Sequence, residues 1–373
     1  MITRFVQDKI RADFDRRKVI VIIGARQVGK TTMVNDIVSN GKTLFLNCDD
    51  SDDRVLIEDK TSTVLRELIS PYDFVFIDEA QRVQDIGLIL KKIGDLKLTT
   101  TVIVSGSSSL DLANTINEPA TGRTLEYNLF PFSSGELALA TSQKDETRML
   151  ESRLIYGLYP DVVNHIADAK RTLMELSNNY LYKDLFSYKG IKKPEVLQKI
   201  LKALALQVGS EVSYNEISNL VGIDKATVEN YINLLEKCFI VFKLDSFSRN
   251  MRNEIKKGKK IYFWDNGIRN AVISNFAPMD CRNDRGALWE NFIISERYKR
   301  NIYMQNYAHL YFWRTHDMKE IDLIEEVDGQ IFAYEFKEKP GKVAKIPADF
   351  DKNYPNTIFQ TITPENYWEF IGL

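Results

Sequence analysis

The stretch VIVIIGARQVGKTTMVNDIV, residues 19–38, decides the fold of the N-terminal part of the chain. It begins with five apolar residues, which is strand length, and ends in a segment with helical spacing. Between them, residues 24–31 match the whole pattern G-x-x-x-x-G-K-S/T, which in this context is typical of a loop that binds phosphate groups. A strand followed by such a loop and a helix predicts an α/β domain built on a parallel sheet.

The loop offers main-chain amides, a cation and a hydroxyl to a nucleotide. Gly24 and Gly29 permit the backbone angles that turn successive N–H groups inward, and the helix that follows adds its dipole. Lys30 can reach β- and γ-phosphates, and the Thr31 hydroxyl is a ligand for Mg²⁺. The residues expected to bind ATP are Gly24, Ala25, Arg26, Gln27, Val28, Gly29, Lys30, Thr31 and Thr32.

A second part of the predicted site follows the buried strand in FVFIDEAQ, residues 74–81. Asp78 emerges at the carboxyl end of this strand, where open α/β sheets bind ligands, so we expect it to hold Mg²⁺. Glu79 is then the residue that polarises the attacking water. Another apolar strand leads to Ser105, whose hydroxyl either senses the γ-phosphate or belongs to a turn. Arg123 is either a phosphate contact, in the same or a neighbouring subunit, or a surface ion pair.

Near the other end, EIDLIEEVDGQIFAYEFK, residues 320–337, predicts a β-hairpin with like charges on one face. Asp328 and Gly329 suit a two-residue type I′ turn, which sets Asp322 opposite Glu335. Like charges that face each other destabilise a sheet. They are tolerable where a cation lies between them or water reaches them freely.

One interpretation of this hairpin is a metal site. Asp322 and Glu335 are then ligands for Mg²⁺ or Mn²⁺, and Lys337 orients the attacking water. This arrangement resembles the core of the PD-(D/E)XK nuclease pattern. The resemblance implies that Glu290, in the helix before the hairpin, adds a further carboxylate. The other interpretation is an ordinary polar face, on which Glu320 and Lys337 form a cross-strand ion pair.

Between these regions, residues 212–241 predict two helices joined by a turn, as in DNA-binding helix-turn-helix units. The second helix exposes Glu229 and Glu236 beside Lys225, and acidic side chains are unfavourable next to phosphates. We therefore favour a packing module over a DNA reader. The basic run at 249–260 is either a nucleic-acid contact or a solvated charge run.

Composition indicates a globular protein but does not identify a binding partner. The 373 residues suggest about two to three domains, and 44% hydrophobic with 27% charged residues is ordinary for globular proteins. The net charge of −2 neither supports nor excludes nucleic acid. Three distant cysteines show neither a metal spacing nor a disulfide framework, which fits a reducing compartment. With no apolar run long enough for a bilayer, we expect a cytoplasmic protein without a membrane partner.

Several motifs together resemble the prokaryotic AAA-type ATPases whose second half is a domain of unknown function with a nuclease-like end. They are GARQVGKTT, FIDEAQ, VSGSSS, TGR, LFPFSSGEL, YGLYPDVVN, YLYKDLF and KIYFWDNGIRNAV. The resemblance covers nearly the whole chain. It implies an AAA-like P-loop domain with a parallel sheet and flanking helices at 1–145. It further implies a helical, winged-helix-like domain at 146–278 and an α+β domain like the PD-(D/E)XK nucleases at 279–373.

Three functions follow from these features. The main prediction is an ATP-hydrolysing switch, dependent on Mg²⁺, that acts on DNA or RNA and carries a nuclease-like domain. The alternative is a nucleotide-dependent scaffold that grips a protein partner, or another copy of itself, without cleaving anything. The third is a Mg²⁺-dependent nuclease for which ATP is only regulatory.

Overall fold

The computed structural model describes residues 2–106, 120–181, 193–249, 258–315, 318–341 and 343–372. The chain forms two compact units. The first unit contains Met1–Phe132 with Lys237–Phe239, and the second contains Ser133–Glu236 with Ile240–Leu373.

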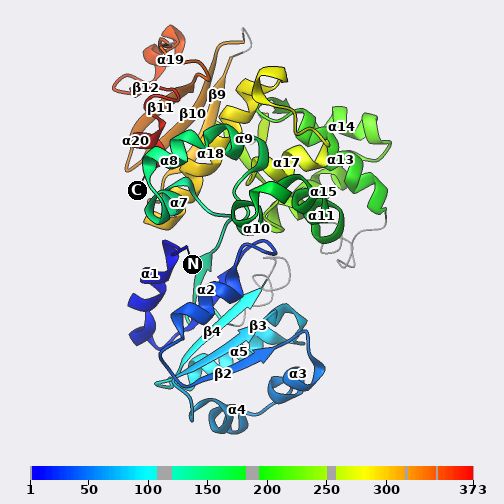
Figure 1. Cartoon of the computed structure of the whole chain (residues 1–373), viewed down its shortest axis with the longest axis vertical. Coiled ribbons are helices and arrows are strands. Elements are labelled where there is room, and N and C mark those ends of the chain that lie inside the picture. Colours follow the sequence, from blue (N-terminus) through cyan, green and yellow to red (C-terminus); the bar gives the residue numbers. More distant parts are fainter. Residues whose placement is uncertain are drawn as a thin grey trace. The chain divides into compact units, whose positions relative to one another are not determined.

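The first unit is built on a five-stranded parallel sheet (Figure 1). Its strands are β1 (Val19–Ile23), β2 (Thr43–Asn47), β3 (Phe74–Asp78), β4 (Thr101–Gly106) and β5 (Thr124–Asn128). They are arranged in the order β2-β3-β4-β1-β5, and all neighbours are parallel. The inner strands are apolar along their length because both faces of the sheet are buried. The predicted α/β fold class is therefore confirmed.

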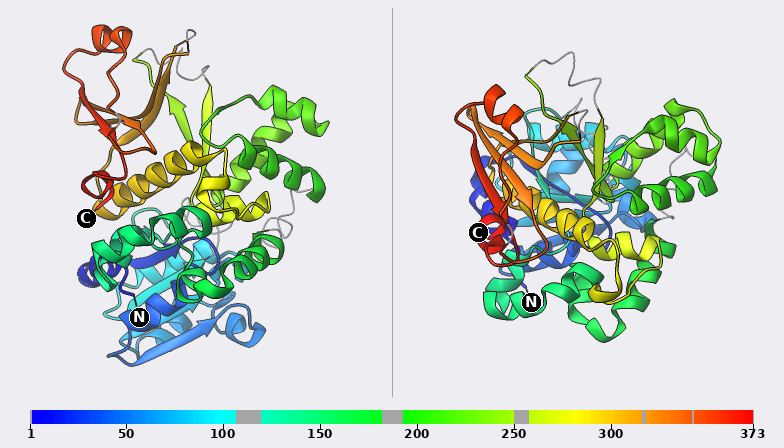
Figure 2. Two further views of the ribbon diagram at one scale, coloured as in Figure 1. Left: turned by 45° about the horizontal axis from the view of Figure 1, so that its top comes forward. Right: turned by 90° about the horizontal axis from the view of Figure 1, so that it is seen from above.

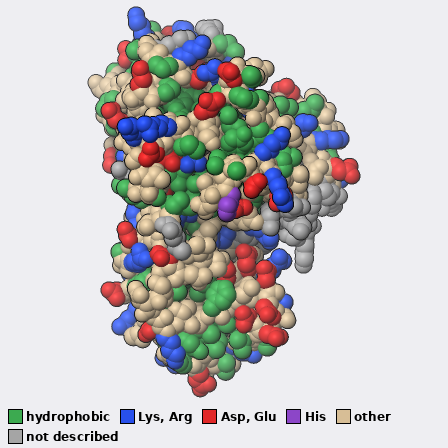
Figure 3. Space-filling view, in the orientation of Figure 1, with side chains coloured by type: hydrophobic (Ala, Val, Ile, Leu, Met, Phe, Trp, Pro, Cys, Tyr) green, Lys and Arg blue, Asp and Glu red, His purple; other side chains and the backbone are tan. Residues whose placement is uncertain are grey.

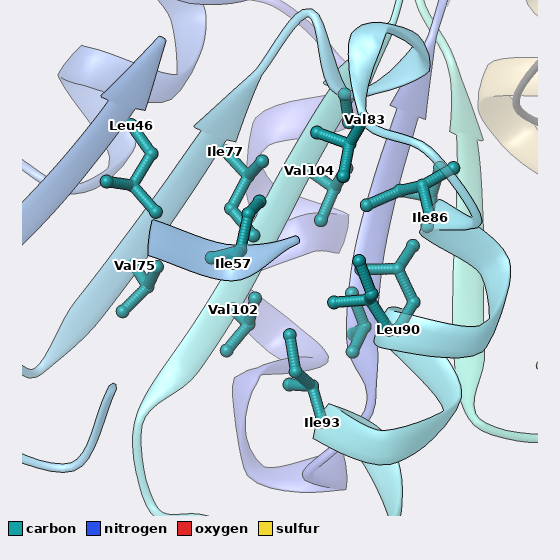
Figure 4. Close-up of a cluster of buried hydrophobic side chains, with 14 of the residues drawn as sticks. Leu46, Ile57, Val75, Ile77, Val83, Ile86, Leu90, Ile93, Val102 and Val104 are labelled. Carbon is teal, nitrogen blue, oxygen red and sulfur yellow. The ribbon is translucent and has the colours of Figure 1, made fainter. Parts of the chain in front are cut away.

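Helices pack on this sheet and produce two apolar layers. Because successive strand residues point to opposite faces, Val75 and Ile77 share one face with Val102 and Val104. Figure 4 shows these side chains packed against residues of the neighbouring helices. The helical segments of the unit are α1 (Val6–Ala12), η1 (Phe14–Arg16), α2 (Lys30–Ile37), α3 (Ser51–Ile57), α4 (Ser62–Ile69), η2 (Ala80–Arg82) and α5 (Ile86–Asp95). Helix α2 packs against β4 and α1.

The second unit combines many helices with one mixed sheet. Its helical segments are α7 (Ser134–Ala140), α8 (Gln143–Arg148), α9 (Leu150–Tyr156), α10 (Pro160–Asn164), η3 (Ile166–Asp168), α11 (Ala169–Glu175), η4 (Leu176–Leu181), α13 (Pro194–Leu206), α14 (Tyr214–Val221), α15 (Lys225–Lys237), α17 (Asn266–Val272), η5 (Met279–Cys281), α18 (Arg285–Met304), α19 (Ala348–Asn353) and α20 (Tyr367–Ile371). None of the helices in the described ranges is both long enough and apolar enough to cross a bilayer.

The sheet of the second unit has seven strands in the order β12-β11-β10-β9-β7-β8-β6. They are β6 (Glu211–Val212), β7 (Val241–Ser246), β8 (Lys259–Phe263), β9 (His309–Arg314), β10 (Glu320–Val327), β11 (Gln330–Phe336) and β12 (Ile358–Ile362). Figure 2 shows the orange and red strands of this sheet beside α18. Strands from the predicted middle and C-terminal domains thus share one sheet, joined where β7 pairs with β9 in parallel. The pairing leaves no open edge on β7.

The hairpin within this sheet has the predicted turn and register. Asp328 and Gly329 both have positive φ, 50° and 82°, as a type I′ turn requires. Val327 pairs with Gln330, and the ladder continues outward in that register. A bulge in the pairing of β10 with β9 then interrupts the regular pattern between Ile321 and Ile324.

Candidate functional site

The phosphate loop connects the inner strand β1 to α2, and both of its motif glycines are required by the local structure. Gly29 precedes α2 with φ of 92°, a conformation that side-chain-bearing residues rarely adopt. A Cβ atom at Gly24 would lie 2.1 Å from the carbonyl oxygen of Leu129, which no side chain can tolerate. Of the predicted loop residues, Gln27 and Thr32 are exposed and the others are buried or half-buried.

Lys30 contributes a positive charge inside the loop. Its side chain is buried, and the Nζ atom donates to the carbonyl oxygens of Gly24 and Ala25 at 2.9 and 2.8 Å. The ammonium group is therefore held by the loop itself, beside the main-chain amides that the motif predicts for phosphate binding.

Asp78 connects two other predicted groups, Thr31 and Ser105, at the carboxyl edge of the sheet. Its Oδ2 atom accepts a hydrogen bond from the Thr31 hydroxyl at 2.7 Å, and its Oδ1 atom accepts one from the Ser105 hydroxyl. Thr31 lies in the first turn of α2, whereas Ser105 is a fully buried residue of β4. Ser105 is thus part of a strand rather than a turn, and its hydroxyl faces Asp78.

Glu79 follows Asp78 in a strained conformation. Its φ is 52°, which costs free energy for any residue with a side chain and is common at functional sites. Its carboxylate accepts a hydrogen bond from the side-chain amide of Gln81, and its own N–H donates to Asp78 at 3.1 Å. Gln81 belongs to the motif FIDEAQ, but the motif alone does not indicate this contact with Glu79.

Arg123 is not brought to the phosphate loop of its own chain. It directly precedes β5, which runs parallel to β1 with Thr124 beside Val19, so Arg123 lies at the amino edge of the sheet. At about 3.3 Å per residue, a five-residue strand separates this edge from the loop by roughly 16 Å. The guanidinium instead forms an ion pair with Asp95 at 2.6 Å. This placement corrects the expectation of a phosphate contact within the chain.

The second candidate site is a group of carboxylates in the second unit, Glu290, Glu320, Asp322 and Glu335, which we call the carboxylate cluster. The Nζ atom of Lys260, on β8, lies 3.0 Å from Glu290 and also bonds Glu320. Burial by itself would lower the pKa of this lysine, but Glu290 and Glu320 outweigh burial and the pKa is raised. Lys260 is therefore a buried, charged ammonium group. It supplies the positive charge that the facing carboxylates of the hairpin led us to expect.

The predicted metal ligands each have a protein partner. Glu290 accepts from the Tyr262 hydroxyl at 2.6 Å as well as from Lys260. Asp322 accepts from the main-chain N–H of Phe336 at 2.7 Å. Burial raises the pKa of Asp322 well above its usual range, and the carboxylates of Glu290 and Glu335 raise it further.

Lys337 completes this arrangement by binding Glu335 at 2.7 Å, whereas Glu320 is paired with Lys260 and with Arg314 at 3.6 Å. Glu320 and Lys337 therefore do not pair with each other, contrary to the alternative interpretation, because each binds a different partner. Among the described residues, no group of three or more His, Cys, Asp or Glu side chains is arranged to hold a metal ion. With Lys260 present, the carboxylate cluster does not fit a divalent cation.

The predicted helix-turn-helix residues form α14 and α15, and the exposed side of α15 carries little net charge. Lys225 and Glu229 are exposed, but Glu236 and Asn233 both bind the ammonium group of Lys243. In the basic run, Lys259 forms an ion pair with Asp245 at 3.7 Å and Lys260 is buried, whereas residues 250–257 lie outside the described ranges.

Comparison with known proteins places this geometry in context. The family profile of an AAA domain matches residues 16–138. The solved structure of the Walker-type ATPase of Pyrococcus abyssi aligns with a TM-score of 0.51 and 15% identity, over 72% of this chain and 94% of that one. The first unit has the fold of a P-loop AAA-type ATPase. We call it the AAA-type unit.

The family profiles that match outside the AAA-type unit, and the relatives named below, carry no named activity. Two domains of unknown function, DUF8612 and DUF4143, match residues 147–278 and 285–363. An uncharacterized protein of Haemophilus influenzae is 24% identical over 335 residues, covering 82% of this chain and 78% of that protein. An uncharacterized protein of Mycobacterium tuberculosis is 22% identical over 334 residues, covering 88% and 72% respectively. These similarities extend well beyond the AAA-type unit.

Proposed function

We propose that the AAA-type unit binds ATP with Mg²⁺ and hydrolyses it, and that hydrolysis drives a conformational switch. The observation that supports this most is the position of Asp78, between the hydroxyls of Thr31 and Ser105 and next to a loop that contains Lys30. A hydroxyl and a carboxylate only 2.7 Å apart are hard oxygen ligands of the kind that Mg²⁺ prefers. When bound, Mg²⁺ would neutralise part of the charge on the phosphate oxygens.

Each residue of the site then has a separate task. The loop amides and Lys30 bind the β- and γ-phosphates, while Thr31 and Asp78 are the residues that would hold the metal. Glu79 orients the attacking water and accepts its proton, and Gln81 fixes the position of the Glu79 carboxylate.

Glu79→Gln tests this division of tasks. Because the amide cannot accept a proton from water, we expect hydrolysis to fall about 100-fold or more. The affinity for ATP should stay close to that of the wild type, since Glu79 does not bind phosphate. Phosphate release and the binding of a fluorescent ATP analogue measure the two effects.

The matched control is Glu67→Gln, the same chemical change at an exposed position of α4, which should alter neither quantity. Loss of ATP binding by the Glu79 variant, or hydrolysis at the wild-type rate, would contradict the role of Glu79 with water.

For the second unit, we propose an action on nucleic acid that follows the nucleotide state. The elements α13, β6, α14, α15, β7 and β8 occur in the order of a winged-helix domain, and β6 pairs with β8 as such a domain requires. The segment between β7 and β8 holds most of the basic run. Contacts of lysine and arginine with phosphates supply most of the affinity for nucleic acid in such proteins.

A protein-interaction scaffold without cleavage is the second candidate, and the position of Lys260 favours it. An ammonium group that pairs with Glu290 and Glu320 would compete with the metal that a PD-(D/E)XK nuclease needs at the carboxylate cluster. Lys243, on β7, donates to the carboxylate of Glu236 on α15, so its ammonium group is already paired within the protein. Figure 3 shows Lys and Arg side chains mixed with Asp and Glu on the face in view.

Fluorescence anisotropy with labelled DNA and RNA, at low and moderate salt, separates these functions. If the second unit acts on nucleic acid, affinity should fall steeply with salt, by about 10³-fold between 50 and 200 mM for several phosphate contacts. Absence of binding at low salt would favour the scaffold. Nucleic-acid cleavage with Mn²⁺ that does not require Lys30 would indicate a nuclease for which ATP is only regulatory.

A further inference from the structure

Arg4 lies outside the loop motif, yet its guanidinium is buried against the loop. Only 4% of the residue is exposed. Nη1 donates to the carbonyl oxygen of Val28 at 2.8 Å, and Nη2 donates to that of Phe130 at 2.6 Å. The group also lies over the ring of Phe132, 4.8 Å from its centroid. One buried cation thus connects the phosphate loop with the segment that follows β5.

The bond to Val28 fixes the orientation of one peptide group of the loop. In a planar trans peptide, the C=O of one residue and the N–H of the next point in opposite directions. Because Arg4 holds the Val28 carbonyl, it directs the N–H of Gly29 the opposite way within the plane of that peptide, away from Arg4. Gly29 has a φ of 92° and enters many conformations at small cost, so this peptide would otherwise turn easily.

The N-terminal segment that carries Arg4 is itself fixed to α2. The main-chain N–H of Arg4 donates to the side-chain oxygen of Gln7 at 2.6 Å. The amide group of Gln7 donates in turn to Asp36 of α2 at 2.7 Å. Since α2 begins at Lys30, the segment contacts both the loop and the helix that the loop precedes.

We propose that Arg4 is a positioning residue for the nucleotide, which orients the Gly29 amide toward the bound phosphates and links the loop to residues 130–132. This inference rests on the proposed binding of ATP. Residues 130–132 lead along the main chain directly into the second unit, which begins at Ser133. A change at the loop can therefore pass through the Arg4 hydrogen bond to Phe130 and on along the chain to that unit.

Arg4→Gln tests the proposal by the affinity for a fluorescent ATP analogue and by kcat. We expect the dissociation constant to rise about 10- to 100-fold, because a charge-assisted contact to the loop is lost. The dissociation constant of Arg4→Lys should lie between those of the wild type and Arg4→Gln, since an ammonium group cannot hold both carbonyls in the planar geometry of a guanidinium. In Arg4→Ala, added methylguanidinium should restore part of the affinity, which a general loss of folding would not allow.

The matched control is Arg11→Gln on α1, which removes a half-exposed arginine whose guanidinium also contacts Asp36. It should leave the affinity for ATP unchanged. Wild-type affinity and kcat in Arg4→Gln would overturn the inference, as would a loss in Arg4→Ala that methylguanidinium does not reverse. If Arg4→Gln does not fold, wild-type affinity in Arg4→Lys would overturn it. If the wild-type chain binds no ATP, the proposed function itself has failed.

Discussion

Replacing Lys30 by alanine should abolish ATP hydrolysis, with kcat lowered about 100-fold or more. Lys30 is the cation inside the loop, and in the structure its Nζ atom is held by the carbonyls of Gly24 and Ala25. Removing it would leave the developing charge on the transferred phosphoryl group without the lysine that the loop motif supplies. Steady-state phosphate release measures the loss, and calorimetry with ATP shows how much binding remains.

The control for this variant is Lys42→Ala, which removes an exposed lysine next to the start of β2. Its side chain lies over the ring of Tyr72 and is at the amino edge of the sheet, away from the loop. Hydrolysis by the control should be unchanged. Turnover retained in Lys30→Ala would remove the assignment of the phosphate loop, and with it the proposed function of the AAA-type unit.

The AAA-type unit is the part of the chain where local sequence determines most of the structure. Its inner strands are continuous apolar runs, and Asp78 and Ser105 each lie at the end of such a run. Asp78 and Ser105 therefore meet because they end neighbouring parallel strands, which alternation and order along the chain already suggest. The hairpin register was predictable for a similar reason, since a two-residue turn allows one pairing of its strands.

What could not be predicted depends on contacts between distant segments. Lys260 belongs to a run of basic residues that reads as a solvated surface, and only the pairing of β8 within the sheet brings its ammonium group to Glu290 and Glu320. Arg4 could not be singled out either, because it lies in an N-terminal segment of mixed charge and its partners, Val28 and Phe130, are distant in the sequence. For Arg123 the sequence left a phosphate contact and a surface ion pair open, and it is the direction of β5 that places this residue at the amino edge, in an ion pair with Asp95.

Replacing Lys260 by methionine should destabilise the second unit by about 3–5 kcal/mol, the usual cost of leaving buried carboxylates without their cation. The Lys260 side chain is 1% exposed and its ammonium group pairs with both Glu290 and Glu320, so water cannot readily replace it. Urea unfolding followed by tryptophan fluorescence measures the change. All four tryptophans lie in the second unit, at Trp264, Trp289, Trp313 and Trp368, so the signal reports on that unit alone.

The neighbouring residue provides the control, because Lys259→Met removes the same group from a partly exposed pair with Asp245 and should change the free energy of unfolding by less than about 1 kcal/mol. Adding Glu290→Gln to Lys260→Met should recover part of the lost stability, since it removes one of the uncompensated charges. Stabilisation of the second unit by Mn²⁺, followed by the same tryptophan fluorescence, would contradict this account, because a cation that binds the native state of that unit must raise its stability. The carboxylate cluster would then hold a metal beside Lys260, and cleavage of nucleic acid would regain its support over the scaffold.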